Sequence, residues 1–340
     1  MIELLQKLIS IPSLSRDESA IANFMQSWLT EEGLAPHRCG TNLWCCHGTG
    51  PAILIDAHMD TVKPVTGWTR DPFTPTVEGR RLYGLGSNDD GASVVALIAA
   101  YKKLIAKPQP YTLILSLSAQ EETSGREGLE ISLPEMEAVC GPIAFGVFGE
   151  PTSLEMAVAE KGLMVLDCSV KGKAGHAARN TGINAIYEAL PAIDWFRNKQ
   201  FDKVSPLLGP VKMTVTQIQA GTQHNVIPDI CTFVVDIRSN GLYTNEELLE
   251  MIKAEAPCQL EARSTRLCGS SIAEDHPLVQ RARELGIPTV GSPTLSNQAL
   301  CRFPSVKIGP GDSVRSHTAD EYVNVADLDK ATNIYVQLLD

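Results

Sequence analysis

The sequence predicts an α/β protein in which a domain with a mostly parallel sheet is interrupted by a second, smaller α+β domain. Two observations predict the first domain: short runs that are apolar throughout, as in strands covered on both faces, and helical segments between them in the chain. A third observation, a change in the order of the expected elements near residue 163, predicts the second domain. The 340 residues are enough for about two domains.

The first domain is expected to begin with two helices, over residues 2–9 and 17–32. In the second helix, apolar residues recur at the spacing of one helical face: Ile21, Phe24, Met25, Trp28 and Leu29. Strands are expected next over the runs 43–46, 52–57, 112–119 and 143–148, with a helix over 91–104. Strands that alternate with helices in this way favour a mostly parallel sheet.

The interrupting domain is expected to span residues 163–268, which leaves 1–162 and 269–340 to the first domain. Its elements are expected over 163–170, 184–196, 211–218, 226–237, 245–255 and 258–263. Read as strand, helix, strand, strand, helix, strand, this is the βαββαβ order of the ferredoxin-like unit. A helix over 277–285, a strand over 305–308 and a helix from residue 326 then complete the first domain.

Composition excludes several classes of protein. Lys and Arg number 29 against 40 Asp and Glu, and the net charge of −11 is unfavourable for binding nucleic acid or an anionic membrane. No apolar run approaches the ~20 residues of a membrane span, and the first residues lack the features of a signal peptide. The nine cysteines include no CxxC pair, which favours reduced thiols and a cytoplasmic location.

His58 and Asp60 directly follow the apolar run that ends at Asp56. In an open α/β sheet, ligands bind at the carboxyl ends of the strands. Residues i and i+2 of an extended segment point the same way, so Asp60 can orient an imidazole that binds a metal. A turn capped by Asp60 is the alternative interpretation.

Asp89 and Asp90 lie in the glycine-rich segment 84–91, just before the helix expected over 91–104. Two acids at this place can complement the helix dipole. A phosphate-binding loop is disfavoured, because two carboxylates would repel a phosphate and the lysine of such loops is absent.

Further acids follow other expected strands. Glu121 and Glu122 come after the run 112–119, and Glu150 comes after 143–148. Neighbouring acids beyond a buried strand are costly unless they neutralise a cation or share a proton, although solvated loop charges are an alternative. With His317, which follows Gly309-Pro310-Gly311, these residues predict a two-metal hydrolase site whose imidazole and carboxylate groups suit zinc.

The order of the motifs resembles that of the aminoacylase, acetylornithine deacetylase and succinyl-diaminopimelate desuccinylase family of dinuclear zinc amidohydrolases. The resemblance covers nearly the whole chain. The motifs that carry it are, in order, LISIPS from Leu8, AHMDTV, YGLGSNDDG, SAQEETSG, GEPT, GKAGHAA, HNVIPD, DIR and IGPGD followed by HTADEYV. It implies a zinc-peptidase-like catalytic domain with an inserted dimerisation domain.

The resemblance also implies a role for each site residue. His58 and Glu150 would hold one Zn²⁺, Glu122 and His317 the other, and Asp89 would bridge them. Co²⁺ or Mn²⁺ can substitute in such a set.

Two further acids would act beside these ligands. Asp60 would orient His58. Glu121 would be the general base that takes a proton from the attacking water and returns it to the leaving amine.

In the inserted domain, the resemblance implies that His176 reaches the site of a neighbouring subunit and stabilises the oxyanion. It therefore implies a homodimer formed through this domain. Asn225 and Arg238 match the substrate-binding Asn and Arg of the family, and Arg suits a bidentate grip on an α-carboxylate. The alternatives are a turn histidine for His176 and a surface salt bridge for Arg238.

The chain departs from the family pattern at two places. Asp89 is followed by Asp90-Gly91 where many members have Met-Lys-Gly, and Asn297 stands where relatives often carry an Asp. Position 297 lies near the substrate loop in the family, so this departure bears on substrate identity.

The C-terminal motifs most resemble those of acyl-ornithine and acyl-lysine deacylases, which implies hydrolysis of N-acetyl-L-ornithine in arginine biosynthesis. N-succinyl-L-ornithine and N-succinyl-diaminopimelate are alternative small-molecule substrates, with Arg302 and Arg315 as candidates to bind a succinyl carboxylate. A dipeptidase or carboxypeptidase of the same family is a further alternative. A non-catalytic metal-binding homologue would be expected to lack Glu121 or a ligand, and none is missing.

Overall fold

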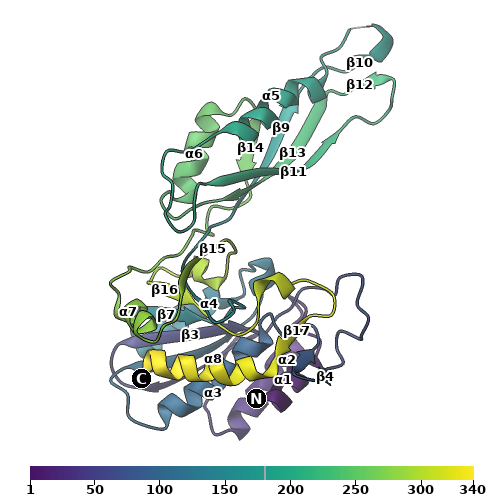
Figure 1. Cartoon of the computed structure of the whole chain (residues 1–340). Helices are drawn as coiled ribbons and strands as arrows, with labels where there is room; N and C mark the ends of the chain where they lie inside the picture. Colours follow the sequence, from purple (N-terminus) through teal and green to yellow (C-terminus); the bar gives the residue numbers. More distant parts are fainter. Residues whose placement is uncertain (180) are drawn as a thin grey trace. The chain divides into compact units, whose positions relative to one another are not determined.

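The computed structural model describes residues 1–179 and 181–340, which form two compact units (Figure 1). The first unit comprises Met1–Val158, Ser271–Val290 and Ser296–Asp340. The second comprises Ala159–Ser270 and Gly291–Leu295, so it includes a short segment from the C-terminal part of the chain. Among the described residues, no helix has the length and apolar character needed to cross a membrane.

The first unit is built on an eight-stranded sheet with the order β1-β2-β6-β3-β7-β16-β8-β15. Its strands are β1 His37–Cys39, β2 Asn42–Gly48, β3 Ala52–His58, β6 Thr112–Ser118, β7 Ile143–Phe148, β8 Met156–Glu160, β15 Thr289–Ser292 and β16 Ser305–Lys307. The three central pairs, β6–β3, β3–β7 and β7–β16, are parallel, whereas β1–β2, β2–β6 and β16–β8 are antiparallel. The predicted α/β class is confirmed, with the parallel pairs at the centre of a mixed sheet.

Alternate residues of the central strands belong to two separate apolar clusters, which explains why these strands are apolar throughout. Ile53 and Ile55 of β3 lie in one cluster, and Leu54 lies in the other. The larger cluster includes residues of α1 Ile2–Ile9, α2 Ser19–Glu31, α3 Gly91–Ile105, α7 Pro277–Glu284 and α8 Val325–Leu339. The smaller cluster includes residues of α4 Leu129–Cys140.

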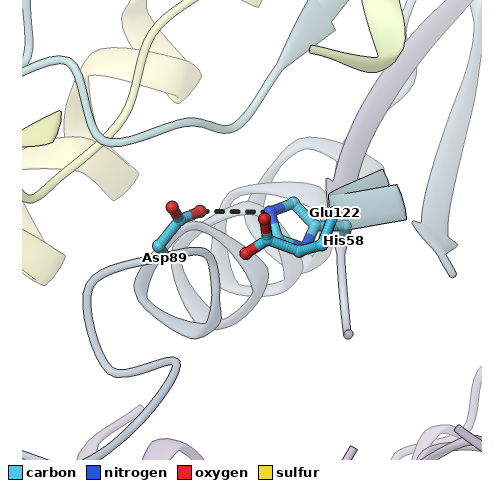
Figure 2. A group of neighbouring side chains, drawn as sticks. All are labelled: His58, Asp89 and Glu122. Carbon is cyan, nitrogen blue, oxygen red and sulfur yellow. Dashed lines mark hydrogen bonds and ion pairs between the residues drawn. The ribbon is translucent and has the colours of Figure 1, made fainter. Parts of the chain in front are cut away.

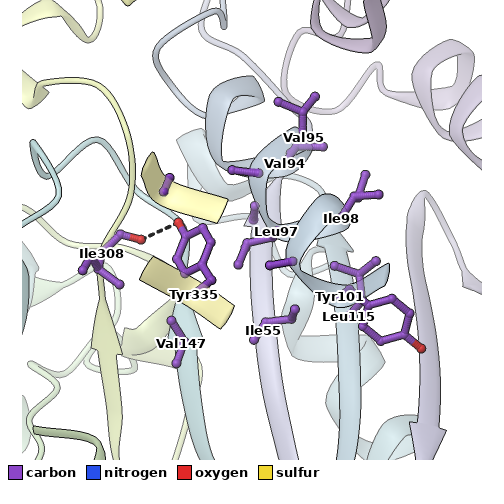
Figure 3. Packing of buried hydrophobic residues seen from close by; sticks show 14 of the residues in the cluster. Ile55, Val94, Val95, Leu97, Ile98, Tyr101, Leu115, Val147, Ile308 and Tyr335 are labelled. Atoms are coloured by element: carbon purple, nitrogen blue, oxygen red, sulfur yellow. Dashed lines mark hydrogen bonds between the residues drawn. The ribbon is translucent and has the colours of Figure 1, made fainter. Parts of the chain in front are cut away.

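Helix α3 is the centre of the larger cluster. Figure 3 shows Val94, Leu97 and Ile98 of α3 packed with Ile55 and Leu115 of the sheet. On its other side, α3 packs against α8, whose Tyr335 donates a 2.7 Å hydrogen bond to the carbonyl of Ile308. This packing fixes the start of α3, directly after Asp89 and Asp90.

Several elements of this unit were not predicted. Helix α4 has Pro134 inside it and buries only Leu129, Ser132 and Met136, so its apolar pattern is weak. The short strands β4 Thr76–Glu78, β5 Arg81–Tyr83 and β17 Tyr322–Asn324 form a separate three-stranded sheet. Strands of three residues are too short for periodicity to reveal them.

The second unit has the predicted ferredoxin-like order. Its main elements are β9 Met164–Lys171, α5 Ala185–Asn198, β11 Lys212–Ala220, β13 Ile230–Arg238, α6 Asn245–Glu255 and β14 Gln259–Ala262. The four strands form an antiparallel sheet with the order β11-β13-β9-β14. Phe233, Val235 and Ile237 of β13 are buried in the core of this unit.

The prediction of a single strand over 226–237 is wrong in one respect, because two separate strands cover these residues. Val226–Ile227 forms β12, which pairs with β10 Gly175–His176, and β13 starts only at Ile230. Pro228 lies at the break, where the absence of a backbone N–H prevents a continuous ladder. The small β10–β12 ribbon carries His176.

Candidate metal centre

The predicted site residues of the first unit converge at the carboxyl ends of the parallel strands. His58 ends β3, Asp89 lies just before α3, and Glu122 lies in a short 3₁₀ turn after β6. One ligand atom of each of these three residues lies within 4.8 Å of the others, so the group can hold a metal ion (Figure 2). His58 Nε2 is 3.1 Å from Asp89 Oδ1.

His317 joins this group from the C-terminal segment. Its Nε2 is 2.8 Å from Glu122 Oε2 and 3.8 Å from Asp89 Oδ2. His317 has a left-handed backbone conformation with φ 60°, which is uncommon outside glycine, although Asn, Asp and His adopt it more often than other residues, and which clusters at functional sites. Glu150 follows the end of β7, and its charge contributes to the raised pKa of Glu121.

Both imidazoles are held by acceptors in a way that favours the protonated form. Burial alone would lower the pKa of His58, but hydrogen bonds with Asp60 and Asp89 outweigh it and raise the pKa well above its ordinary value. The hydrogen bond to Glu122 raises the pKa of His317 to about 9, although burial opposes this. His58 Nδ1 donates to the backbone carbonyl of Asp60 at 2.9 Å, which leaves Nε2 as the nitrogen that faces the cluster.

The site contains more carboxyl groups than positively charged groups. Burial raises the pKa of Glu121 well above its ordinary value, and the charges of Glu150 and Glu122 raise it further. Burial likewise raises the pKa of Asp90, which is 1% exposed. An excess of buried negative charge together with imidazole nitrogens fits divalent metal ions with N and O ligands.

Asp60 has a wider role than the sequence predicts. Its carboxylate is 3.5 Å from His58 Nδ1, and it also accepts the backbone N–H groups of Glu121 at 3.0 Å and Glu122 at 3.1 Å. The Ser15 hydroxyl donates to Asp60 Oδ2 at 2.5 Å. Asp60 therefore fixes the turn that carries Glu121 and Glu122, in addition to its contact with His58.

Three further residues hold the site, and sequence reasoning assigned them no role. Glu18, which is buried, accepts the N–H of Gln120 at 3.2 Å, next to Glu121. Asn88 bonds to the backbone of Asp312, and Glu321 bonds to the backbone of the Asp89 loop. Asn88 lies in the motif YGLGSNDDG and Glu321 in HTADEYV, so the sequence indicates that both residues belong to the site region. Their partners are backbone groups, which no sequence pattern identifies.

Asn297 is buried, and its side chain is bonded to polar groups of β3 and β6. Its Nδ2 donates to Ser118 Oγ at 2.9 Å and to Asp56 Oδ2 at 3.3 Å. Burial raises the pKa of Asp56 to about 6. An Asp at position 297 would place a second carboxylate against Asp56, so the buried Asp56 accounts for the Asn found here. Arg315 stacks on the ring of Tyr322, 4.5 Å from its centroid, and Arg302 is exposed.

The predicted residues of the second unit lie at two places, with His176 and Asn225 at one and Arg238 at the other. His176 and Asn225 are exposed at the β10–β12 ribbon, where the Ala177 N–H donates to the Asn225 carbonyl at 3.0 Å. Arg238 ends β13, and its Nε and Nη2 donate to the Asp236 carboxylate at 2.8 and 3.1 Å. A substrate carboxylate would have to bind Arg238 through Nη1 and the remaining N–H of Nη2, or displace Asp236.

The α/β fold, the convergent imidazole and carboxylate groups and the partly buried Glu121 beside them define a metal-dependent amidohydrolase. The sequence model described as Peptidase family M20/M25/M40 matches residues 54–340. The chain belongs to this family, as the order of its motifs implies.

Two curated relatives match along nearly their whole length. The chain is 28% identical to an acetylornithine deacetylase of Proteus mirabilis (strain HI4320), over 100% of this chain and 96% of the relative. It is 27% identical to a succinyl-diaminopimelate desuccinylase of Delftia acidovorans, over 99% of this chain and 97% of the relative.

Solved structures share the fold at lower identity. A tripeptidase from Staphylococcus aureus subsp. aureus Mu50 matches with a TM-score of 0.79 and 20% identity, covering 99% of this chain and 96% of that chain. A Bacillus subtilis protein described as a dinuclear metal binding peptidase from the M20 family matches with a TM-score of 0.73 and 21% identity, covering 99% and 96%.

Proposed function

We propose that this chain hydrolyses the amide bond of an N-acyl amino acid, with N-acetyl-L-ornithine as its substrate and arginine biosynthesis as its role. The observation that carries amide hydrolysis is the position of Glu121. Glu121 is partly buried and follows β6, its backbone N–H donates to Asp60, and its neighbour Glu122 belongs to the candidate metal group. The similarity to an acetylornithine deacetylase over the full length supports the substrate.

In this proposal the protein holds two Zn²⁺ ions. His58 and Glu150 would hold one ion, Glu122 and His317 the other, and Asp89 would serve both. When bound, the ions would polarise the substrate carbonyl and acidify the attacking water.

Glu121 would perform the proton transfers. A general base needs a pKa near the working pH, and burial raises the pKa of Glu121 in that direction. The Glu121 carboxylate would take the proton of the attacking water. It would then deliver this proton to the amine nitrogen as the amide bond breaks.

His176 would donate a hydrogen bond to the developing oxyanion from the partner subunit. The Ala178 N–H donates to His176 Nδ1 at 3.2 Å. Since Nδ1 accepts this bond, the neutral ring carries its proton on Nε2, which can act as the donor. Asn225 and Arg238 would bind the substrate, the latter through its α-carboxylate.

We further propose that the second unit forms the dimer interface. Helix α5 and the residues before it present a stripe of exposed apolar side chains at helical spacing: Ile183, Tyr187 and Leu190, with 50%, 68% and 53% of their surface exposed. Exposed apolar groups gathered on one face are typical of an interaction surface. The isolated chain would leave this stripe in water, so a second copy is the proposed occupant.

A succinyl substrate is the second candidate. The desuccinylase relative is nearly as similar as the deacetylase, at 27% against 28% identity with matching coverage. N-succinyl-L-ornithine and N-succinyl-diaminopimelate would each bring an additional carboxylate that an arginine can bind.

The test is release of the free amino acid by the Zn²⁺-loaded protein. N-acetyl-L-ornithine, N-succinyl-L-ornithine and N-succinyl-diaminopimelate are compared under identical conditions, and the kcat/KM values identify the acyl group. The proposal expects N-acetyl-L-ornithine to give the highest value. A protein that holds two metal ions and cleaves neither ornithine substrate would overturn the ornithine assignment while leaving the amidohydrolase class intact.

A further inference from the structure

Glu321 is a buried carboxylate that the proposed chemistry does not use. It is 2% exposed and lies four residues after His317, within the HTADEYV motif. Within the described residues it forms no ion pair, and its side-chain hydrogen bonds are made to backbone N–H groups instead. A carboxylate buried in this way requires such donors to offset its lost hydration.

All of these donors belong to the loop that presents Asp89. Glu321 Oε1 accepts the N–H of Asn88 at 2.8 Å and the N–H of Asp89 itself at 2.9 Å. Glu321 Oε2 accepts the N–H of Gly86 at 3.1 Å. The Glu321 carbonyl accepts a fourth bond, from the N–H of Gly84 at 3.0 Å. The loop from Gly84 to Asp89 is thus wrapped around one glutamate.

A second link joins the same loop to the other side of His317. Asn88 Oδ1 accepts the N–H of Asp312 at 2.8 Å, and Asn88 Nδ2 donates to the Asp312 carbonyl at 3.2 Å. Gly311, at φ 88°, permits this close approach, because a Cβ there would lie 2.4 Å from Asn88 Oδ1. The segment that carries His317 is therefore tied to the Asp89 loop both before and after His317.

The geometry points to Glu321 as a positioning residue that holds Asp89 and His317 in the arrangement needed to bind the two metal ions. This inference rests on the proposed metal centre. The carboxylate bonds the amide of the very residue proposed to serve both ions, and its own strand β17 follows at once and fixes the glutamate in the fold. Outer-shell partners of this kind typically change metal affinity by about 10- to 100-fold when they are removed.

The chemistry of the contact requires a carboxylate. A glutamine at position 321 would keep one oxygen for Asn88 and Asp89 but would turn an NH₂ group toward the Gly86 N–H, placing two donors against each other. An aspartate would keep both oxygens, but it is shorter by one methylene and would not reach all three amides.

The experiment measures Zn²⁺ stoichiometry and affinity by calorimetry, together with the visible absorption spectrum of the Co²⁺-substituted protein. We expect Glu321→Gln to lower the affinity for at least one ion by about 10-fold or more and to change the Co²⁺ spectrum. Glu321→Asp should show a smaller loss. Asp327→Asn, which removes a carboxylate from the start of α8, is the matched control and should bind as the wild type does.

The outcomes separate this inference from the proposed function. A wild-type protein that binds no metal overturns the proposed centre itself. A wild type that binds two ions while Glu321→Gln binds them with equal affinity and an unchanged Co²⁺ spectrum overturns the role of Glu321, even if the variant is less stable.

A measurement on the wild type covers the case in which Glu321→Gln fails to fold. Hydrogen exchange of the metal-free protein should show the amides of Gly86, Asn88 and Asp89 protected, because Glu321 accepts all three. Exchange of these amides at the rate of exposed loops would overturn the inference.

Discussion

His317 Nε2 lies 2.8 Å from Glu122 Oε2, although the two residues are 195 positions apart in the chain. The proposal assigns these two side chains to the same metal ion. The two side chains are also hydrogen-bonded to each other, and this contact raises the pKa of His317 to about 9. The same bond that assembles the site therefore places a proton where a metal ion would bind.

Metal affinity should consequently rise with pH. A proton on His317 must leave before Nε2 can bind a metal, and since the pKa is about 9 the proton is present at pH 7. His58, whose pKa is raised in the same direction, adds to this effect. The apparent Zn²⁺ or Co²⁺ affinity should increase from pH 6 toward pH 9. Calorimetry at pH 7 in buffers of different ionisation enthalpy should detect released protons, and heats independent of the buffer would contradict this prediction.

Glu121→Ala should separate metal binding from catalysis. The variant removes the proposed base and leaves the proposed ligands, so both ions should remain bound while kcat falls by about 10²- to 10⁴-fold. Metal content and turnover are measured on the same sample. Glu137→Gln, an exposed acid on α4, is the control. Turnover near that of the wild type in Glu121→Ala would show that another group accepts the proton.

Ser15→Ala should destabilise the protein and weaken the site. The Ser15 hydroxyl donates to the buried Asp60 carboxylate at 2.5 Å, and losing a bond to a charged group costs about 1–3 kcal/mol. Urea unfolding of the metal-free protein measures this loss. Ser10→Ala provides a matched control, because Ser10 donates only to the Gln6 carbonyl in an exposed position. Equal stability of the two variants would contradict the assigned contact.

Asn297→Asp should destabilise the protein in a pH-dependent way. Asp56 has a pKa of about 6 in the folded protein against its ordinary 3.8, so its burial cost is present above pH 6 and disappears as the pH falls toward 4. Replacing Asn297 by Asp would remove the Nδ2 donor and place a second carboxylate beside Asp56. The free energy of unfolding should fall by about 1–3 kcal/mol or more at pH 8.

Urea unfolding at pH 8 and pH 5 measures the effect, which should shrink at the lower pH. The double variant Asp56→Asn with Asn297→Asp exchanges donor and acceptor and should recover stability at pH 8. A loss that is the same at both pH values, or a double variant that is no better than the single one, would rule out the pairing.

Tyr187→Glu should dissociate the proposed dimer. Tyr187 is 68% exposed in the single chain, so a charge there should leave the folded unit intact. Light scattering should give the mass of a dimer for the wild type and of a monomer for the variant, and activity should fall with dissociation if His176 acts across subunits. Lys253→Glu on α6 serves as the control. A monomeric wild type with full activity would exclude the dimer.

Much of the fold could be predicted because the informative strands are buried on both faces. The runs that became β3, β6 and β7 are apolar without interruption, and parallel strands end at one edge of a sheet. His58 and Glu122 could therefore be expected to lie close together from their places after β3 and β6. The break at Pro228 is not evident from the sequence, because residues 226–237 have the composition of one strand. Only the pairing of β12 with β10 shows that two strands are present.

The residues that hold the site could not be predicted in the same way. Glu18, Asn88 and Glu321 act by binding backbone groups of distant segments, and a backbone amide has no residue type that a sequence pattern could reveal. Asn297 stood out as a departure from a family pattern, but its reason, the buried Asp56 beside it, depends on the packing of β3 against the segment after β15.

Reconstitution of the metal-free protein would show whether amide hydrolysis depends on two bound metal ions. The purified chain is stripped with a chelator and titrated with Zn²⁺, while metal bound and hydrolysis of N-acetyl-L-ornithine, N-succinyl-L-ornithine and N-succinyl-diaminopimelate are followed together. We predict no hydrolysis without metal and full activity near two equivalents of Zn²⁺. Amide hydrolysis that persists at the same rate in the metal-free protein would contradict this prediction.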